Sequence, residues 1–142
     1  MKKIHFQIVT PEKIVYKDEV ESISIPTQMG EITVLPNHAP LISALKPGEL
    51  HIKKDGIEVN MAVSGGFIQV QPKSKVVILA DTVERAEEIS EERAEAARRR
   101  AEEILKEKRL DKAELVTAAA NLEKSLIRLK VARRRSRSRH SI

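Results

Sequence analysis

The chain has 142 residues, which suffices for one domain of ordinary size or for a small domain with an appendage. It contains no cysteine, which excludes disulfide bonds and thiolate metal sites, and no stretch reaches the roughly 20 apolar residues of a membrane-spanning helix. The formal net charge is +5, but residues 1–89 carry −2, from ten basic and twelve acidic residues, and residues 90–142 carry +7, from sixteen and nine.

The N-terminal part is predicted to be all-β. It starts with lysines but lacks a continuous apolar segment, so we expect a soluble protein that is not exported. Short apolar or alternating runs follow, broken by turn residues every eight to twelve positions. We expect a β-sandwich of about nine to ten strands over residues 1–83.

Four signals predict where this part turns. Lys17-Asp18-Glu19 predicts a break between two strand pieces, and Asp55-Gly56 predicts a tight hairpin. Ser64-Gly65-Gly66 predicts a corner or a close backbone approach. Residues 26–48 hold four of the six prolines yet stay apolar between them, which is typical of a chain that turns inside a packed domain.

The C-terminal part is predicted to be helical. From Val83 to Arg135 there is neither Gly nor Pro, and strong helix formers dominate. Ser90 is a predicted N-cap, and Asp111 with Glu114 predicts the start of a second helix. We expect an antiparallel hairpin over residues 84–135, followed by a disordered basic tail over 136–142.

The seam of this hairpin is predicted to be thin. Small or apolar residues recur along one face of each helix, at Ala94, Ala97, Ala101, Ile104 and Leu105 in the first and at Leu115, Ala119, Leu122, Leu126 and Leu129 in the second. Alanines bury little apolar area, so the two helices should separate easily. The basic charge of this part favours an acidic surface, a nucleotide or a nucleic acid as its partner.

Catalytic signals are weak. The four histidines are scattered, and no glycine-rich phosphate loop of the P-loop type is present. His38 lies between two prolines without an acidic neighbour, which is more typical of a packed or interface residue than of a catalytic base. We therefore expect no catalytic residue and no metal site.

Several motifs, in order along the chain, resemble one family. They are Ile8-Val9-Thr10-Pro11-Glu12, Gly30-Glu31, Leu35-Pro36-x-His38-Ala39-Pro40, Pro47-Gly48, Ser64-Gly65-Gly66-Phe67, Ile78-Leu79-Ala80 and Ile89-x-x-x-Arg93-Ala94. This set resembles the ε subunit of bacterial F-type rotary ATP synthases. The resemblance implies a non-catalytic central-stalk subunit on the cytoplasmic face of the cell membrane, which couples γ to the c ring and inhibits ATP hydrolysis through a mobile helical hairpin.

The resemblance also implies where the rotor binds. The turn around Met29, Gly30 and Glu31 would face the membrane c ring, and the segment from His38 to Leu45 would face the γ subunit, with the role carried by motif match to His38, Ala39, Pro40 and Leu41. Met29 fits a contact surface, since a large apolar side chain at a predicted turn tip is unusual otherwise. When extended, the hairpin would reach the catalytic α/β head, whose acidic segments suit the basic second part.

The family pattern for nucleotide binding is Ile or Leu, then Asp, two variable residues, Arg and Ala. This chain has Ser90 at the Asp position, and Ser caps a helix about as well. The resemblance implies ATP with Mg²⁺ as a regulatory ligand, no cofactor being required. Its ligands would be Glu84, Ile89, Ser90, Arg93, Ala94, Arg100, Lys124 and Arg128. A solvated helix face explains the run Arg98-Arg99-Arg100 equally well.

The residues alone also allow a different class of function, namely nucleic-acid binding. The Arg- and Ser-rich tail fits a β module with a basic helical arm that binds RNA or a ribosome. Aromatic residues make up only 2% of the chain and Trp is absent, so platforms for base stacking are nearly missing. We therefore expect no nucleic acid among the partners.

Overall fold

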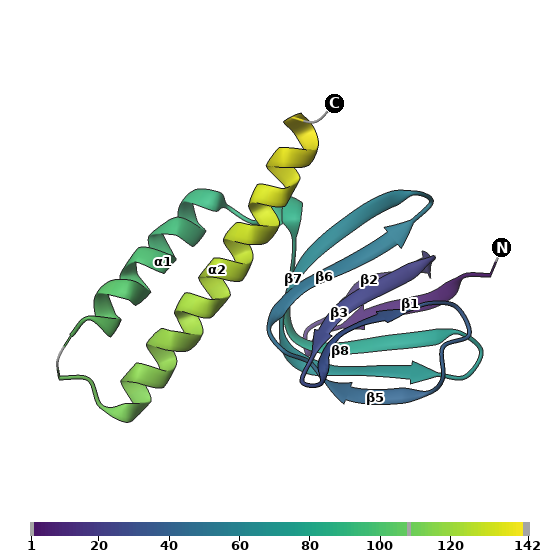
Figure 1. Cartoon of the computed structure of the whole chain (residues 1–142), viewed down its shortest axis with the longest axis horizontal. Coiled ribbons are helices and arrows are strands. Elements are labelled where there is room, and N and C mark those ends of the chain that lie inside the picture. The colour runs from purple at the N-terminus through teal and green to yellow at the C-terminus, as the bar shows by residue number, and fades with distance from the viewer. Residues whose placement is uncertain (1, 108, 141–142) are drawn as a thin grey trace. The chain divides into compact units, whose positions relative to one another are not determined.

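The computed structural model describes residues 2–107 and 109–140, with side chains through Arg134. The chain divides into two units, Met1–Arg85 and Ala86–Ile142. The first consists of strands and the second of helices (Figure 1). This arrangement confirms the predicted class, a β-sandwich followed by two helices.

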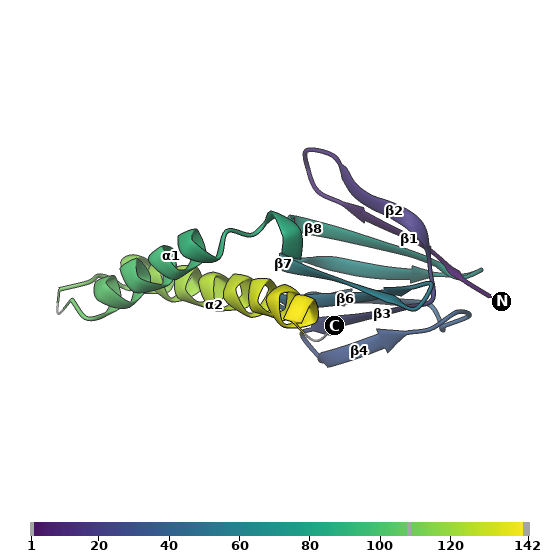
Figure 2. The ribbon, with the colours of Figure 1, turned by 90° about the horizontal axis from the view of Figure 1, so that it is seen from above.

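The first unit has eight strands within residues 2–85. They are β1 (Ile4–Val9), β2 (Ile14–Val20), β3 (Ser22–Thr27), β4 (Gly30–Val34), β5 (Leu41–Ala44), β6 (Gly48–Lys54), β7 (Ile57–Gln71) and β8 (Lys75–Arg85). Hydrogen bonding follows the order β2-β1-β8-β7-β6-β3-β4, which Figure 2 shows from above, and β5 pairs with β7. The pairing of β1 with β8 is parallel and the other strand pairings are antiparallel.

Alternation along the strands builds the core. In β1, Ile4, Phe6 and Ile8 are fully buried while His5 is exposed, because successive side chains of a strand point to opposite faces. The same alternation in the other strands completes a single cluster of buried apolar residues. Its largest fully buried members are Phe6, Ile4, Ile8, Ile23, Ile25, Leu50, Ile52, Met61, Ile68, Ile78, Val20 and Val34.

The predicted break at Lys17-Asp18-Glu19 is wrong. These residues lie inside β2 and pair with Gln7, Phe6 and His5 of β1, and the chain leaves the strand only at residue 21. Because β2 is an edge strand of the sheet, it carries polar residues without burying them. Lys54 hydrogen-bonds to Asp18 and lowers the pKa of that carboxyl, while the pKa of the Lys54 ammonium is raised.

No corner occurs at Ser64-Gly65-Gly66, because β7 runs through it. The two glycines adopt φ angles of +62° and +112°, and pairing with β8 continues on either side in the same register, from Ser64↔Thr82 to Gly66↔Ala80. The expected close approach of backbones is present. A Cβ on Gly66 would lie 1.9 Å from the carbonyl oxygen of Leu79.

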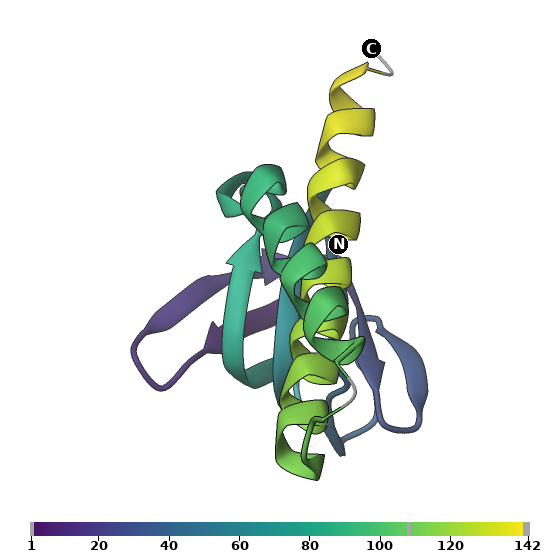
Figure 3. The ribbon, with the colours of Figure 1, turned by 90° about the vertical axis from the view of Figure 1, so that its left-hand side faces the viewer.

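The second unit is a helical hairpin. It comprises the short 3-10 helix η1 (Ala86–Glu88), α1 (Glu91–Leu105) and α2 (Lys112–His140). Figure 3 shows α1 and α2 side by side. Both predicted caps are present: the Ser90 hydroxyl accepts from the Arg93 N–H at 3.3 Å, and the Asp111 carboxylate accepts from the Glu114 N–H at 2.8 Å.

The C-terminal helix is longer than predicted. We expected the hairpin to end at residue 135, but α2 is helical through His140. The segment 136–140 contains neither Gly nor Pro, so no residue in it breaks the helix. The tail over residues 136–142 is predicted to be disordered. Residues 136–140 are helical instead, and residues 141–142 lie outside the described residues.

The seam of α2 differs from the predicted stripe. Leu115 and Leu126 are 45% and 49% exposed, whereas Ala118 and Ser125 are buried. Ala118 and Ser125 line cavities together with Ile104 of α1, which places them at the seam. Leu129 of the predicted stripe is buried, so the closed hairpin uses small side chains together with this leucine, while Leu115 and Leu126 stay about half exposed.

Candidate functional site

The turn between β3 and β4 is rigid at its base and apolar at its tip. The Thr27 hydroxyl donates to the Gly30 carbonyl at 2.6 Å and accepts from the Met29 N–H at 3.2 Å. Gly30 has a φ of +111°, a region that favours glycine. Met29 is 76% exposed and Glu31 is exposed beside it, so this turn presents an ordered apolar contact point.

The loop that holds His38 is fixed to the turn between β7 and β8. The Asn37 N–H donates to the Ser74 hydroxyl at 2.8 Å, and that hydroxyl donates to the Asn37 side chain at 3.2 Å. His38 Nδ1 lies 2.7 Å from the Ala39 carbonyl oxygen, which accepts its hydrogen. Ala39 and Pro40 are exposed, so the loop offers a contact surface and no acid–base pair.

An apolar strip lies next to this loop on the outer face of the sandwich. Ile42 is 69% exposed, Phe67 is 55% exposed and Leu79 is 51% exposed. Ala44 pairs with Phe67 and Phe67 pairs with Leu79, so these side chains share one face across β5, β7 and β8. Clustered exposed apolar residues mark interaction sites in soluble proteins.

Sequence reasoning missed Phe67 and Leu79 of this strip, whereas Ile42 lies in the segment that the family resemblance places against γ. Among the rotor residues named from the family motif, Leu41 packs against the core, while its neighbour Ile42 points outward. The available signal was the alternation in β7 and β8, where both phases are apolar: Ile68 and Ile78 face the core, and Phe67 and Leu79 face out.

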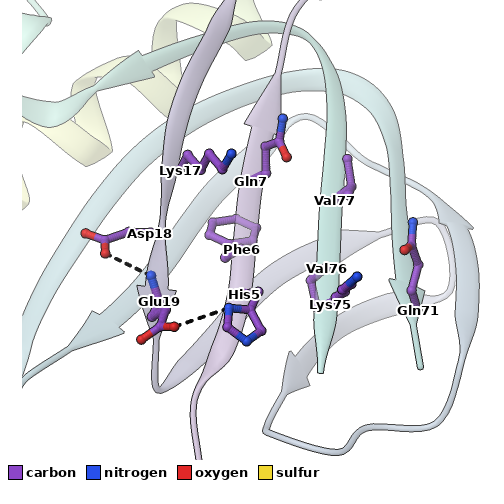
Figure 4. A pocket seen from close by; sticks show the side chains of 10 residues that line it. All are labelled: His5, Phe6, Gln7, Lys17, Asp18, Glu19, Gln71, Lys75, Val76 and Val77. Carbon is purple, nitrogen blue, oxygen red and sulfur yellow. Dashed lines mark hydrogen bonds and ion pairs between the residues drawn. The ribbon is translucent and has the colours of Figure 1, made fainter. Parts of the chain in front are cut away.

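A mixed-charge hollow lies on the outer face of β1, β2 and β8 (Figure 4). Its volume is about 640 Å³, and His5 Nδ1 lies 3.3 Å from a Glu19 carboxylate oxygen at its rim. Lys17 and Lys75 add positive charge on the same side. With both signs interspersed and no enclosed apolar floor, the hollow has no charge preference for a ligand.

The hairpin brings three of the predicted nucleotide ligands together. Arg100 of α1 and Lys124 and Arg128 of α2 line one cavity of about 270 Å³. The other lining residues are Ala97, Ala101, Ile104, Asn121 and Ser125, so no carboxylate lines it. Three cations around a cavity without an acidic lining residue form an electropositive site that suits phosphate oxygens.

The remaining predicted ligands do not line this cavity. Ser90 caps α1, Arg93 is exposed one turn along the same helix, and Ile89 and Ala94 are buried. Arg93 and Arg100 are seven residues apart and so share a helix face. Glu84 belongs to β8, where it pairs with Ala62 in the other unit.

An ion-pair network joins α1 to α2 at the open end of the hairpin. Arg133 Nε lies 3.3 Å from Glu91 Oε1, and Arg133 Nη2 lies 3.5 Å from Glu95 Oε2. Glu95 also accepts from Arg98 at 3.0 Å, and Arg98 donates to Glu102 at 2.8 Å. The hydrogen bond from Arg98 is the main reason why the pKa of the Glu95 carboxyl is lowered.

Two classes of site are absent from the described residues. No three His, Cys, Asp or Glu side chains among those described, in residues 2–107 and 109–134, cluster in a way that would hold a metal ion. Within the same residues, none of the helices combines the length and the apolar character that crossing a membrane requires.

Two family models match almost the whole chain. The ATP synthase delta/epsilon chain β-sandwich domain matches residues 3–86, and the ATP synthase delta/epsilon chain long α-helix domain matches residues 87–133. The boundary between the two matches lies next to the boundary between the two structural units.

Relatives and solved structures agree with these matches. The chain is 44% identical to the ATP synthase epsilon chain of Herpetosiphon aurantiacus over 93% of this chain and 96% of the relative. It is 49% identical to that of Chloroflexus aggregans over 91% of each. Its structure is similar to a chain in the mitochondrial ATP synthase of Euglena gracilis, OSCP/F1/c-ring, with a TM-score of 0.78 and 26% identity over 87% of this chain and 77% of that one. The sandwich, the hairpin and these similarities together show that the chain belongs to the ATP synthase delta/epsilon chain family.

Proposed function

We propose that this chain is a non-catalytic subunit of the rotor of an F-type ATP synthase. The sandwich unit connects a γ-type shaft subunit to the membrane c ring, and the hairpin inhibits ATP hydrolysis when it opens. The subunit is held peripherally at the membrane through this complex. The observation that carries the proposal is the strip of Ile42, Phe67 and Leu79 beside the ordered His38 loop.

The strip and the β3–β4 turn are two separate contact surfaces on one rigid unit. Phe67 lies on β7, which pairs with β5, β6 and β8, and Met29 lies on a turn fixed by side-chain hydrogen bonds. A subunit that transmits torque needs two such surfaces without a hinge between them. We assign the strip to γ and the Met29 turn to the c ring.

The packing of the hairpin supports a switch. In α2, Leu115, Ala119, Leu122, Leu126 and Leu129 recur at steps of four and three, which is the spacing of a coiled-coil seam. Leu115 and Leu126 of this set are left about half exposed, while Leu129, Ala118 and Ser125 are buried in the closed hairpin. Burying one leucine contributes roughly 1.5–3 kcal/mol. A helical partner that covers the leucine stripe would therefore compete with the closed hairpin for α2.

Removal of the hairpin tests this function. In an F1 complex assembled with its own α, β and γ subunits, deleting residues 86–142 should raise ATP hydrolysis and leave the sandwich unit bound to γ. The measurement is the steady-state hydrolysis rate together with co-purification of the truncated chain. An unchanged hydrolysis rate would contradict inhibition by the hairpin, and loss of the truncated chain from the complex would contradict the clamp.

We propose in addition that the cavity of Arg100, Lys124 and Arg128 binds the phosphates of MgATP and so favours the closed hairpin. Its volume of about 270 Å³ is just below the roughly 300 Å³ at which sites for whole small molecules begin. Phosphate groups therefore fit it better than a complete nucleotide does. Because the cavity is built from both helices, a ligand in it binds the closed state preferentially.

Calorimetric titration with MgATP tests this site. The intact chain should bind one nucleotide, and Arg100→Ala should bind at least about tenfold more weakly, because a charged hydrogen bond contributes roughly 1.5–3 kcal/mol. Arg109→Ala is the matched control: Arg109 is an exposed arginine between the two helices and does not line the cavity. Absence of heat at millimolar MgATP, with folded helices by circular dichroism, would exclude the sensor.

A further inference from the structure

Arg133 lies where the two helices of the hairpin are furthest from their connecting turn. It contacts Glu91 in the first turn of α1, at 3.3 Å, and Glu95 one turn later, at 3.5 Å. These contacts join residues 42 and 38 positions apart in the chain. A contact at this end opposes separation of the helices more effectively than one near the turn, because the turn keeps its neighbours together in any case.

Arg133 has no acidic partner within one turn of its own helix, whereas Glu95 also pairs with Arg98 and Arg99 of α1. Positions three and four residues from Arg133 are Leu129, Lys130, Ser136 and Arg137, which include no carboxylate. Along α1, Glu91 and Glu95 are four residues apart, a spacing at which like charges repel. Closing the hairpin places the Arg133 guanidinium between the two carboxylates and relieves this repulsion.

The surroundings strengthen the contact. Only 24% of the Glu95 side chain is exposed, and its carboxylate is held in place by Arg98, whose own orientation is fixed by Glu102. Arg133 therefore meets a carboxylate that is already ordered, which reduces the entropy lost on pairing. Next to these ion pairs, Ala94 of α1 and Leu129 of α2 are buried, so the ion pairs add to apolar packing at the open end.

We propose that Arg133, held between Glu91 and Glu95, is the clasp that sets the balance between the closed and the open hairpin. This inference rests on the proposed switch between a closed and an open hairpin, and it names the residues that control that switch. When the clasp opens, Arg133 is released beside Arg134, and the acidic residues of α2, Glu114 and Glu123, are more than two helical turns away from it. The open form then presents free positive charge to an acidic partner surface, whereas the closed form satisfies that charge internally.

Paired labels on the intact chain measure this balance. The chain has no cysteine, so Ala96→Cys in α1 and Ala120→Cys in α2, both at exposed positions, accept a donor and an acceptor dye. Single-molecule energy transfer then gives the ratio of open to closed hairpins. Arg133→Ala should raise this ratio about two- to tenfold at low salt, given the usual strength of exposed ion pairs, and less at high salt. Arg109→Ala removes the same charge near the turn and should leave the ratio unchanged.

A double-mutant cycle separates the clasp from a general effect of charge. Glu91→Gln with Glu95→Gln should raise the ratio by itself, and adding Arg133→Ala to them should change it little further, because the partners are already gone. Additive effects, or equal ratios for Arg133→Ala and Arg109→Ala, would overturn the clasp. The proposed function fails in a different way: the assembled complex without residues 86–142 would hydrolyse ATP at an unchanged rate even though Arg133→Ala opens the hairpin.

Discussion

Phe67→Asp is expected to abolish binding of the chain to its γ subunit and to leave the sandwich folded. Phe67 is 55% exposed at the centre of the strip, between Ala44 of β5 and Leu79 of β8. Truncation of an aromatic residue at the centre of an interface typically costs about 2 kcal/mol or more, which is about thirtyfold in affinity. The aspartate adds the cost of a carboxylate that loses its water without gaining a partner.

The control for this variant lies on the same strand. Ile57 is also a large exposed apolar residue of β7, at 67% exposure, but it stands ten residues from Phe67, roughly 33 Å along a strand. Ile57→Asp should bind γ like the unchanged chain. Affinities from biolayer interferometry, with melting temperatures of all three proteins, provide the comparison. Equal binding by Phe67→Asp and Ile57→Asp would remove the strip as the γ surface.

Gly66→Ala is expected to destabilise the sandwich unit by at least about 3 kcal/mol, since backbone strain and a steric clash act together. The φ of Gly66 is +112°, and an added Cβ would lie 1.9 Å from the Leu79 carbonyl oxygen and 2.9 Å from the Ala80 Cα. Both atoms belong to the backbone of the paired strand, so no side chain can move aside. Relief requires β7 and β8 to separate next to Phe67.

A second glycine with positive φ provides the comparison. Gly56 has a φ of +78°, but its added Cβ would meet nothing within 4 Å, so Gly56→Ala should cost only the strain of about 1 kcal/mol. Urea unfolding followed by the fluorescence of Tyr16, the only tyrosine in a chain without tryptophan, reports on the sandwich unit. A Gly66→Ala protein as stable as Gly56→Ala would mean that the strands adjust locally.

Local signals in the sequence predicted the elements well. Ser90 and Asp111 were identified as caps from residue type and spacing alone, because a cap is made by groups three residues apart. Signals that depend on distant partners failed. The break expected at Lys17-Asp18-Glu19 is absent because β1 pairs with these residues and Lys54, 36 positions away, hydrogen-bonds to Asp18.

The candidate functional sites show the same contrast between local signals, which the sequence reveals, and arrangements that depend on distant residues. Family motifs led to Met29 and His38, and the structure shows them on ordered, accessible turns. Phe67 and Leu79 were not found, because a strand that is apolar in both phases does not reveal which phase faces the core. Nor does the sequence reveal which of two seams α2 uses, since its leucines and its small residues both recur at helical spacing.

The parallel pairing of β1 with β8 has a consequence for the order in which the protein forms. Residues 5–9 find their neighbours at residues 75–79, so the first strand stays without this partner until the last strand of the unit has left the ribosome. Such long-range pairing is slow, whereas the hairpin of residues 86–140 depends on contacts closer in sequence and forms fast. During synthesis, the two helices can therefore form before the sandwich unit has finished folding.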